Sequence, residues 1–266
     1  DDKRLITYAE SHDEERLMYK NLNFGNSSNS KHNVKEIEVA LERMKSLGAS
    51  LLLIPGPKMI WHFSEMGMEN SIFSCEDGSY GGEDCKLSTK PQPQWNNDWT
   101  LLNKRKEIYD YWKKLIELKI KEPVFEGEYD LKVLNQNYLL PTIDIWNDKL
   151  SGDSLKYVYV ISNFDVTKKS LTLDLPISGE WKNLINNDII NFSQNSTINL
   201  EPGTSLVLGN YLDCGSTDYD GDGIGDVCDD DRDGDGILNS IDSCPDSTVG
   251  ITVDVTGCEI FTLPLD

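Results

Sequence analysis

Two runs of alternating carboxylates near the end of the chain have the spacing of a cation site. Residues 218–226 read Asp-Tyr-Asp-Gly-Asp-Gly-Ile-Gly-Asp, and residues 231–239 repeat the pattern with Asn at the last position. Alternate acidic side chains in a turning loop bring their oxygens to one point, and calcium takes roughly six to eight such ligands. Gly223 and Gly236 allow the backbone reversal that each loop needs. We therefore expect Ca2+ as a cofactor, bound by Asp218, Asp220, Asp222, Asp226, Asp231, Asp233, Asp235 and Asn239.

Two other interpretations of these runs fit less well. An EF-hand carries a bidentate Glu at the end of its loop, which both runs lack, and flanking helices, which the sequence does not indicate. An acidic solubilising linker has no need of a spacing that repeats. Residues 213–246 hold twelve Asp and few apolar residues, so without a cation we expect this region to lack a core and to be disordered.

A second cluster of reactive side chains lies near the start of the chain. Residues 10–16 read Glu-Ser-His-Asp-Glu-Glu-Arg and follow the apolar residues 5–9 directly. A carboxylate beside an imidazole could bind sugar hydroxyls and support the oxocarbenium-like transition state of glycosyl transfer. The alternative is a solvated charged loop, since charged residues are mostly exposed. Composition alone leaves both interpretations open.

The elements that must position this cluster alternate between strand and helix. Residues 5–9 and 59–63 are typical of short buried strands, and residues 34–47 and 101–119 carry apolar side chains at helical spacing. Asn33 is a candidate N-cap for the first helix. This alternation predicts parallel strands joined by right-handed crossovers, with chemistry at their carboxyl ends.

The pattern changes to a period of two after Pro123. Residues 157–161, 170–175 and 205–208 alternate as half-buried strands do, and turn signals lie between them. These features predict an antiparallel β-sandwich over residues 123–209.

Charge excludes two classes of function. The chain has a net charge of −21, of which residues 213–246 contribute −11. Because this field repels phosphate and no basic stripe opposes it, nucleic-acid binding is excluded. The longest apolar run is far shorter than the roughly 20 residues that a membrane-spanning helix needs, so no membrane span is expected.

Six cysteines, an even number, indicate disulfides in an oxidising compartment and hence a secreted or cell-surface protein. A zinc site is the alternative, but the gaps are too long for paired ligands. Six cysteines allow fifteen connectivities, and the sequence does not select one. No signal peptide is recognisable, so we expect that one was removed or that the chain is part of a longer precursor. The disulfide candidates are Cys75, Cys85, Cys214, Cys228, Cys244 and Cys258.

Two motifs resemble the α-amylase superfamily, glycoside hydrolase family 13. Residues 8–16, Tyr-Ala-Glu-Ser-His-Asp-Glu-Glu-Arg, are similar to the family's seventh-strand motif. Residues 55–67 are similar to its eighth strand, in which a Gly-Pro turn leads to a strand that ends in Ser-Glu-Met-Gly. The order of the motifs and the sandwich that follows them match the family too. The resemblance covers residues 1–209 and implies the last strands and helices of a TIM (β/α)8 barrel in residues 1–122.

The resemblance implies a retaining hydrolase that acts on α-1,4-glucan. By it, Asp13 is the transition-state stabiliser and His12 binds sugar hydroxyls. Glu10, Arg16 and Trp61 are further candidates for substrate binding, although core anchoring is the commoner use of Trp.

One departure from the family is serious. Its nucleophile Asp and acid/base Glu lie on the fourth and fifth strands, and this chain resembles the family only from the seventh. A retaining mechanism needs both groups about 5–5.5 Å apart. We therefore expect no hydrolysis by this chain alone.

Residues 218–244 resemble thrombospondin type 3 repeats. The resemblance adds Asp242 to the calcium ligands and implies a disulfide-linked spacer or stalk in residues 210–247. Residues 248–266 are then a tail or the start of a further domain, with cell-surface or sorting machinery as a possible partner. The module order is similar to that of secreted Bacteroidetes amylases. A glucan branching enzyme or glucanotransferase, and a calcium-dependent stalk or adhesion protein with an inactive barrel remnant, remain alternatives.

Overall fold

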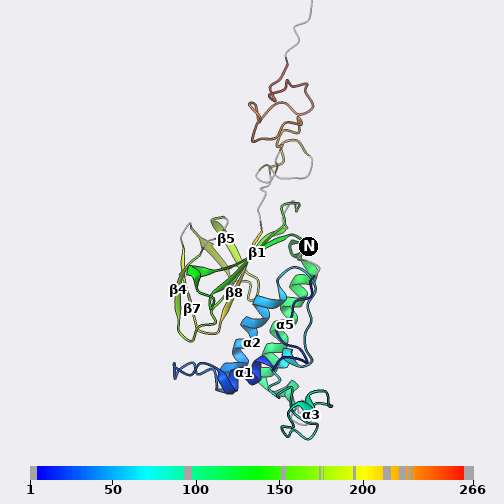
Figure 1. Ribbon diagram of the computed structural model, residues 1–266. Helices are drawn as coiled ribbons and strands as arrows, with labels where there is room; N and C mark the ends of the chain where they lie inside the picture. The colour runs from blue at the N-terminus through cyan, green and yellow to red at the C-terminus, as the bar shows by residue number, and fades with distance from the viewer. Residues whose placement is uncertain are drawn as a thin grey trace, which may run out of the picture. The chain divides into compact units, whose positions relative to one another are not determined.

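The computed structural model describes residues 5–92, 98–150, 154–173, 175, 177–193, 196–211, 217–221, 226, 229 and 231–260. The chain forms two compact units (Figure 1). The first contains Asp1–Asn147 and Tyr157–Asn210, and the second contains Asp148–Lys156 and Tyr211–Asp266. The helices and the β-sandwich therefore lie in the same unit.

Two long helices, α2 (Ile37–Leu52) and α5 (Asn103–Lys121), pack against each other in the first unit. Trp112 of α5 is buried and donates its indole N–H to the carbonyl of Met44 at 2.8 Å. A Cβ at Gly48 would lie 2.4 Å from the indole nitrogen, so glycine is what allows this close approach. Both helices are confirmed as the apolar spacing predicts. The other helical elements are α1 (Leu17–Phe24), α3 (Glu83–Lys86), η2 (Ser64–Met66), η3 (Trp99–Leu101), η4 (Pro123–Glu126) and η5 (Leu134–Gln136).

The start of α2 differs from the expectation. Glu36 occupies the N-cap position and makes no capping bond through its side chain. Asn33 instead accepts a hydrogen bond from the backbone N–H of Lys35 at 3.1 Å, which closes a turn ahead of the helix. The helix begins four residues after the predicted cap.

The period-two region forms the expected β-sandwich. One sheet has six strands in the order β1-β2-β3-β8-β5-β6, and the other pairs β4 with β7. Side chains from both sheets meet in one core, among them Tyr159, Leu171, Trp181 and Leu208. The strands are β1 (Glu128–Val133), β2 (Pro141–Trp146), β3 (Leu155–Ser162), β4 (Lys169–Thr172), β5 (Gly179–Asn183), β6 (Ile189–Phe192), β7 (Thr197–Leu200) and β8 (Ser205–Tyr211).

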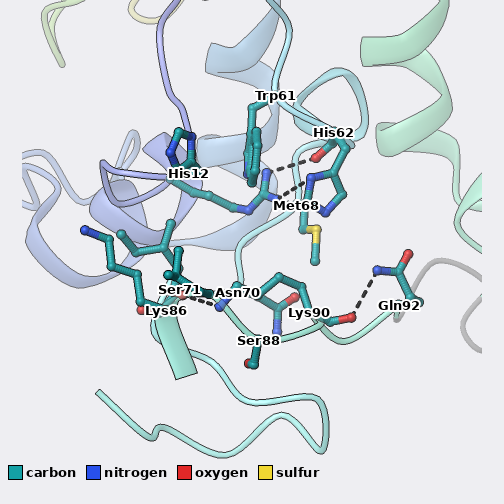
Figure 2. Close-up of a pocket in the computed structure, with 13 residues that line it drawn as sticks. His12, Trp61, His62, Met68, Asn70, Ser71, Lys86, Ser88, Lys90 and Gln92 are labelled. Atoms are coloured by element: carbon teal, nitrogen blue, oxygen red, sulfur yellow. Dashed lines mark hydrogen bonds between the residues drawn. The ribbon is translucent and has the colours of Figure 1, made fainter. Parts of the chain in front are cut away.

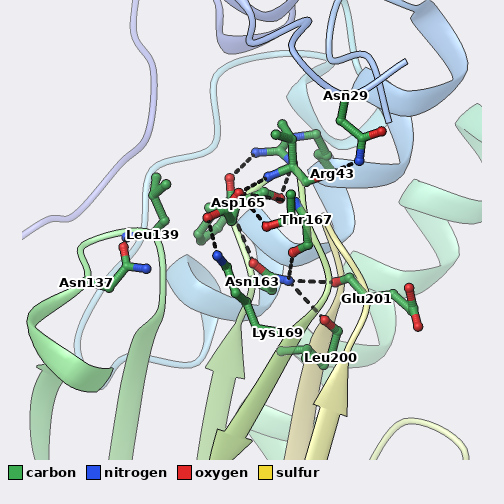
Figure 3. A network of polar contacts seen from close by, with 12 residues as sticks. Asn29, Arg43, Asn137, Leu139, Asn163, Asp165, Thr167, Lys169, Leu200 and Glu201 are labelled. Atoms are coloured by element: carbon green, nitrogen blue, oxygen red, sulfur yellow. Dashed lines mark hydrogen bonds and ion pairs between the residues drawn. The ribbon is translucent and has the colours of Figure 1, made fainter. Parts of the chain in front are cut away.

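Hydrogen bonds join α2 to one end of the sandwich (Figure 3). Arg43 donates to the carbonyl of Phe164 at 2.8 Å, and the buried Ser46 donates to the carbonyl of Gly203 at 2.7 Å. On the sandwich side, the buried amide of Asn163 donates to the carbonyls of Thr167, Leu200 and Glu201. Because buried polar groups that are fully paired rigidify their surroundings, the helices and the sandwich hold a fixed mutual orientation.

The predicted buried strands of the barrel portion are a correction, whereas the long helices expected after them are present. The described residues form no (β/α)8 barrel, and the two expected buried strands are reduced to one parallel bridge between Thr7 and Lys58. Leu5 and Ile6 are 65% and 62% exposed. The physical reason is that about three strands are needed for a stable sheet, and a single bridged pair has nothing on either side to cover it.

Candidate functional site

A cavity of about 240 Å³ lies in the first unit, beside the cluster at residues 10–16 (Figure 2). His12, Trp61 and His62 lie along one side of it, and Ser71, Lys86, Ser88 and Lys90 lie along the other. The cavity is thus built from segments that are far apart in the sequence.

The bridge between Thr7 and Lys58 sets the first side of the cavity. The N–H of Thr7 donates to the carbonyl of Pro57 at 3.2 Å, and the N–H of Met59 donates to the carbonyl of Thr7 at 3.0 Å. The two segments leave this bridge in the same direction and bring His12 and Trp61 together, with ring centroids 5.9 Å apart. Both predicted sugar contacts therefore face one hollow.

Asp13 stands beside this hollow with a nitrogen close to each carboxylate oxygen, and its contact with Lys86 is an ion pair. His12 Nε2 lies 3.2 Å from Oδ2, and Lys86 Nζ lies 3.2 Å from Oδ1. The Asp13 side chain is 60% exposed, so its ion pair with Lys86 contributes about 0–1 kcal/mol and can be exchanged for another partner. Asp13 can accept hydrogen bonds from an incoming ligand.

Glu10 and Arg16 form a buried ion pair behind the cavity, at 3% and 2% exposure. Arg16 Nη1 lies 3.3 Å from Glu10 Oε1 and donates to the carbonyl of His62 at 3.0 Å. Glu10 also accepts from the hydroxyl of Ser64 and, at 2.7 Å, from the backbone N–H of Leu17. Burial lowers the pKa of Arg16, and the charge of Glu10 opposes that shift. Arg16 reaches the cavity wall, whereas Glu10 does not line it.

His62 and Glu65 lie just beyond the bridge, and burial perturbs both. Burial and the positive charge of Arg16 lower the pKa of His62, so this imidazole is neutral at pH 7. Burial raises the pKa of Glu65, although Arg16 opposes that change. Glu65 lines a separate hollow of about 390 Å³ with Ile60 and Trp112. The two imidazoles of the cavity, at His12 and His62, therefore differ in their surroundings.

The second wall of the cavity comes from a disulfide-closed loop that sequence reasoning did not connect with the site. Cys75 and Cys85 are bonded, with Cα atoms 4.9 Å apart, and Cys85 lies in α3 directly before Lys86. Lys90 fixes the loop because its ammonium donates to the carbonyls of Ile72, Ser74 and Cys85. Cys75 and Cys85 are among the disulfide candidates, but the sequence does not select their pairing, and no sequence signal shows that this loop returns to the cavity.

No carboxylate pair lines the cavity in the part of the chain that the structure describes. A retaining glycosidase needs two carboxyl groups about 5–5.5 Å apart across the scissile bond. The described residues that line this cavity therefore do not supply such a pair.

The described parts of the two acidic repeats share one equivalent hydrogen bond. The N–H of Tyr219 donates to Asp226 Oδ1 at 2.8 Å, and the N–H of Arg232 donates to Asn239 Oδ1 at 3.1 Å. These equivalent bonds each span seven residues. Asp222 lies outside the described residues.

The second repeat gathers carboxylates around a point. One oxygen each of Asp231, Asp233 and Asp235 lies within 4.8 Å of the others, and Asp233 is fully buried. Four buried oxygens have no hydrogen-bond partner: Oδ1 of Asp231, Oδ1 of Asp233, Oδ2 of Asp235 and Oδ2 of Asp242. Unpaired buried carboxylates are costly unless a cation neutralises them. The donor set of hard oxygens fits Ca2+.

Residues 248–260 are tied to the acidic repeats by a disulfide. Cys244 and Cys258 are bonded, with Cα atoms 5.1 Å apart, and Val253 bridges Glu259. The N–H of Ser247 donates to Asp233 Oδ2 at 2.6 Å. The disulfide candidates Cys214 and Cys228 lie outside the described residues.

Comparisons with known proteins find relatives of each of the two units. Residues 217–248 match the thrombospondin type 3 repeat. No curated protein matches the chain. No helix in the described part of the chain is long and apolar enough to cross a membrane.

Solved α-amylase structures share the fold of the first unit. An Anoxybacillus α-amylase matches with a TM-score of 0.52 at 18% identity, over 78% of this chain and 38% of that one. AmyP in complex with maltotriose matches with a TM-score of 0.56 at 17% identity, over 77% and 40%. A maltogenic α-amylase from Thermotoga neapolitana matches with a TM-score of 0.52 at 18% identity, over 78% and 41%.

The chain thus spans about two fifths of the length of these amylases. The resemblance read from the two motifs and the Asp repeats is confirmed, at the level of fold for the amylase part. The disulfides and the thrombospondin type 3 repeat are compatible with an extracellular protein.

Proposed function

We propose that the first unit is the C-terminal part of an α-amylase-type glycoside hydrolase that acts on α-1,4-glucan by a retaining mechanism. The observation that carries this proposal is that His12 and Trp61 line one cavity where the bridged segments end, while Asp13 lies beside it, 3.2 Å from His12 Nε2. A carboxylate, an imidazole and an aromatic face are the groups that bind sugar hydroxyls and a sugar ring.

Each residue has a distinct role in this proposal. Asp13 accepts hydrogen bonds from the sugar hydroxyls and stabilises positive charge at the oxocarbenium-like centre. His12 donates to a hydroxyl, and Trp61 stacks on the ring. Arg16 supports the ring of Trp61 from 5.6 Å and is itself held by Glu10, so these two act chiefly by positioning.

Hydrolysis needs a nucleophile and an acid/base from elsewhere, so this chain alone is expected to bind without turnover. The first test is calorimetry with maltotriose. The chain should bind, and Asp13→Asn should weaken binding about tenfold, the effect of one charge-assisted hydrogen bond. Asp110→Asn, on an exposed face of α5, is the matched control and should leave binding unchanged. Turnover of soluble starch that Asp13→Asn abolishes would overturn the expected inactivity.

The second unit is proposed to hold calcium in its thrombospondin type 3 repeats and to serve as an extracellular spacer. Asp218, Asp220 and Asp226 would serve the first loop together with Asp222. Asp231, Asp233, Asp235, Asn239 and Asp242 would serve the second. The ion would neutralise carboxylates that otherwise repel one another.

A second candidate function is a calcium-dependent stalk protein with an inactive barrel remnant. The lack of any carboxylate among the described residues that line the cavity favours it. Maltotriose discriminates the two, because a stalk protein has no reason to retain a sugar site that depends on Asp13.

A further inference from the structure

The cavity beside Asp13 is unusual in its charge. The chain has 46 acidic and 25 basic side chains, not counting His. Yet none of the thirteen residues that line the cavity is acidic, while Arg16, Lys86 and Lys90 are basic and two are histidines. Two carboxylates adjoin this wall from outside: Asp13 pairs with Lys86, and Glu15 accepts hydrogen bonds from Ser71 and Ile72. The ionisable side chains that line the cavity itself are basic, so a negatively charged ligand finds a cation there.

Two of the three basic side chains already use their charged groups in contacts within the protein. Arg16 is paired with Glu10 and donates to the carbonyl of His62. Lys90 directs its ammonium to three backbone carbonyls of the disulfide loop. Neither can turn to a ligand without leaving a buried acceptor unpaired.

Lys86 is the cation that remains available. Its ammonium forms an ion pair with Asp13, whose other carboxylate oxygen already has His12 as a partner. Because Asp13 is well exposed, exchanging this pair for another anion costs little. An anionic group on a ligand would take Lys86 and leave Asp13 Oδ1 free for a sugar hydroxyl.

Lys86 is also held in place. It is the last residue of α3, next to Cys85, whose disulfide to Cys75 closes the loop. The side chain is only 23% exposed, so its ammonium has few positions to occupy. A preorganised cation binds an anion with less loss of entropy than a free surface lysine.

From these observations we propose that the cavity takes a sugar that carries an anionic group, a phosphate, sulfate or carboxylate, and that Lys86 binds that group. The volume of about 240 Å³ is below the roughly 300–1,000 Å³ of sites for drug-sized ligands, which suits one sugar ring and its substituent. The inference rests on the proposed function, since it narrows the α-1,4-glucan of that proposal to one whose sugar at this site carries an anionic group.

The test is a titration followed by NMR of the His12 ring and the Trp61 indole, at constant ionic strength. The probes are glucose, glucose 6-phosphate, glucuronate and inorganic phosphate. We expect glucose 6-phosphate or glucuronate to bind about tenfold more tightly than glucose, the effect of one charge-assisted contact. Whichever of the two binds more tightly identifies the anionic group.

Three variants isolate Lys86. Lys86→Gln should bring the anionic sugar to within about twofold of glucose, and Lys86→Arg should retain the preference because the charge is kept. Lys106→Gln, an exposed lysine also paired with an Asp, is the control and should change nothing.

Two outcomes would overturn the inference alone. Equal affinity for glucose and both charged sugars would remove the selectivity and leave the proposed function standing. Inorganic phosphate that binds as tightly as glucose 6-phosphate would show a plain anion site. If neither these sugars nor maltotriose shifts His12 or Trp61, the inference and the proposed function fail together.

Discussion

Gly257 offers a sharp perturbation of the proposed calcium cage. An added Cβ at this position would lie 1.9 Å from Asp242 Oδ1 and 3.1 Å from Asp235 Oδ2. Ordinary contact begins at 3.4 Å, so the Asp242 carboxylate must move by about 1.5 Å. Calcium–oxygen distances span only about 2.3–2.6 Å, so a ligand displaced that far is lost from the ion.

The matched control is Gly250. Both glycines have positive φ, +83° at Gly257 and +79° at Gly250, so alanine costs about 1–2 kcal/mol of backbone strain at either. A Cβ at Gly250 meets nothing within 4 Å. The two variants therefore share the strain and differ only in the contact with Asp242 and Asp235.

Calcium titration by calorimetry, with circular dichroism to follow order, measures the difference. Gly257→Ala should weaken calcium binding about 10–100-fold, the range found when support around a metal ligand is lost. Gly250→Ala should stay within about twofold of the parent chain, because its strain does not reach the ligands. Equal weakening by both variants would refute the reasoning, since backbone strain alone would then explain the effect.

Other perturbations test the rest of the structure. Chelation of calcium should unfold the second unit and leave the thermal transition of the first unchanged by calorimetry, because the first has its own apolar core; one joint transition would contradict this. Arg16→Met should destabilise the first unit by about 3–5 kcal/mol in urea, because it strands the buried carboxylate of Glu10; a loss under about 1 kcal/mol would show that the pair is not buried in solution. Burial and the charge of Lys58 lower the pKa of Lys119 to about 7, from an ordinary value of 10.5. Because the pKa of Lys119 is lower in the folded than in the unfolded chain, burying its charged ammonium costs folding free energy. This cost is largest below pH 7 and fades as the pH rises toward 10.5, above which the lysine is neutral in both states. Lys119→Met should thus raise the melting temperature at pH 7 and below and lose this gain at high pH, while the exposed control Lys121→Met should show no such trend.

The sequence predicts local features of this protein well and tertiary placement poorly. The spacing of the Asp repeats predicts a cage that the structure shows as buried, unpaired oxygens, because the geometry of a cation loop is local. The long helices follow from their apolar faces for the same reason. The strands at residues 5–9 and 59–63 fail because apolar, β-prone residues form a buried strand only when neighbouring strands cover them, and Leu5 is exposed here.

In the candidate site too, the sequence predicts local motifs but not the contacts that the tertiary fold makes. His12 and Asp13 are found from their motif, but Arg16, read as a substrate contact, is buried beside Glu10. Lys86 escapes detection because it lies more than 70 residues from Asp13 in the chain, and only the fold of the disulfide loop brings the two together. No local periodicity encodes such a contact.

The central claim is that the cavity beside Asp13 binds sugar, and NMR mapping of maltotriose tests it most directly. The account predicts that the largest shifts fall on the His12 ring and the Trp61 indole, with none on the exposed Tyr138 of the sandwich, and that Asp13→Asn removes them. Shifts confined to the sandwich, or shifts at Trp61 that survive Asp13→Asn unchanged, would contradict it.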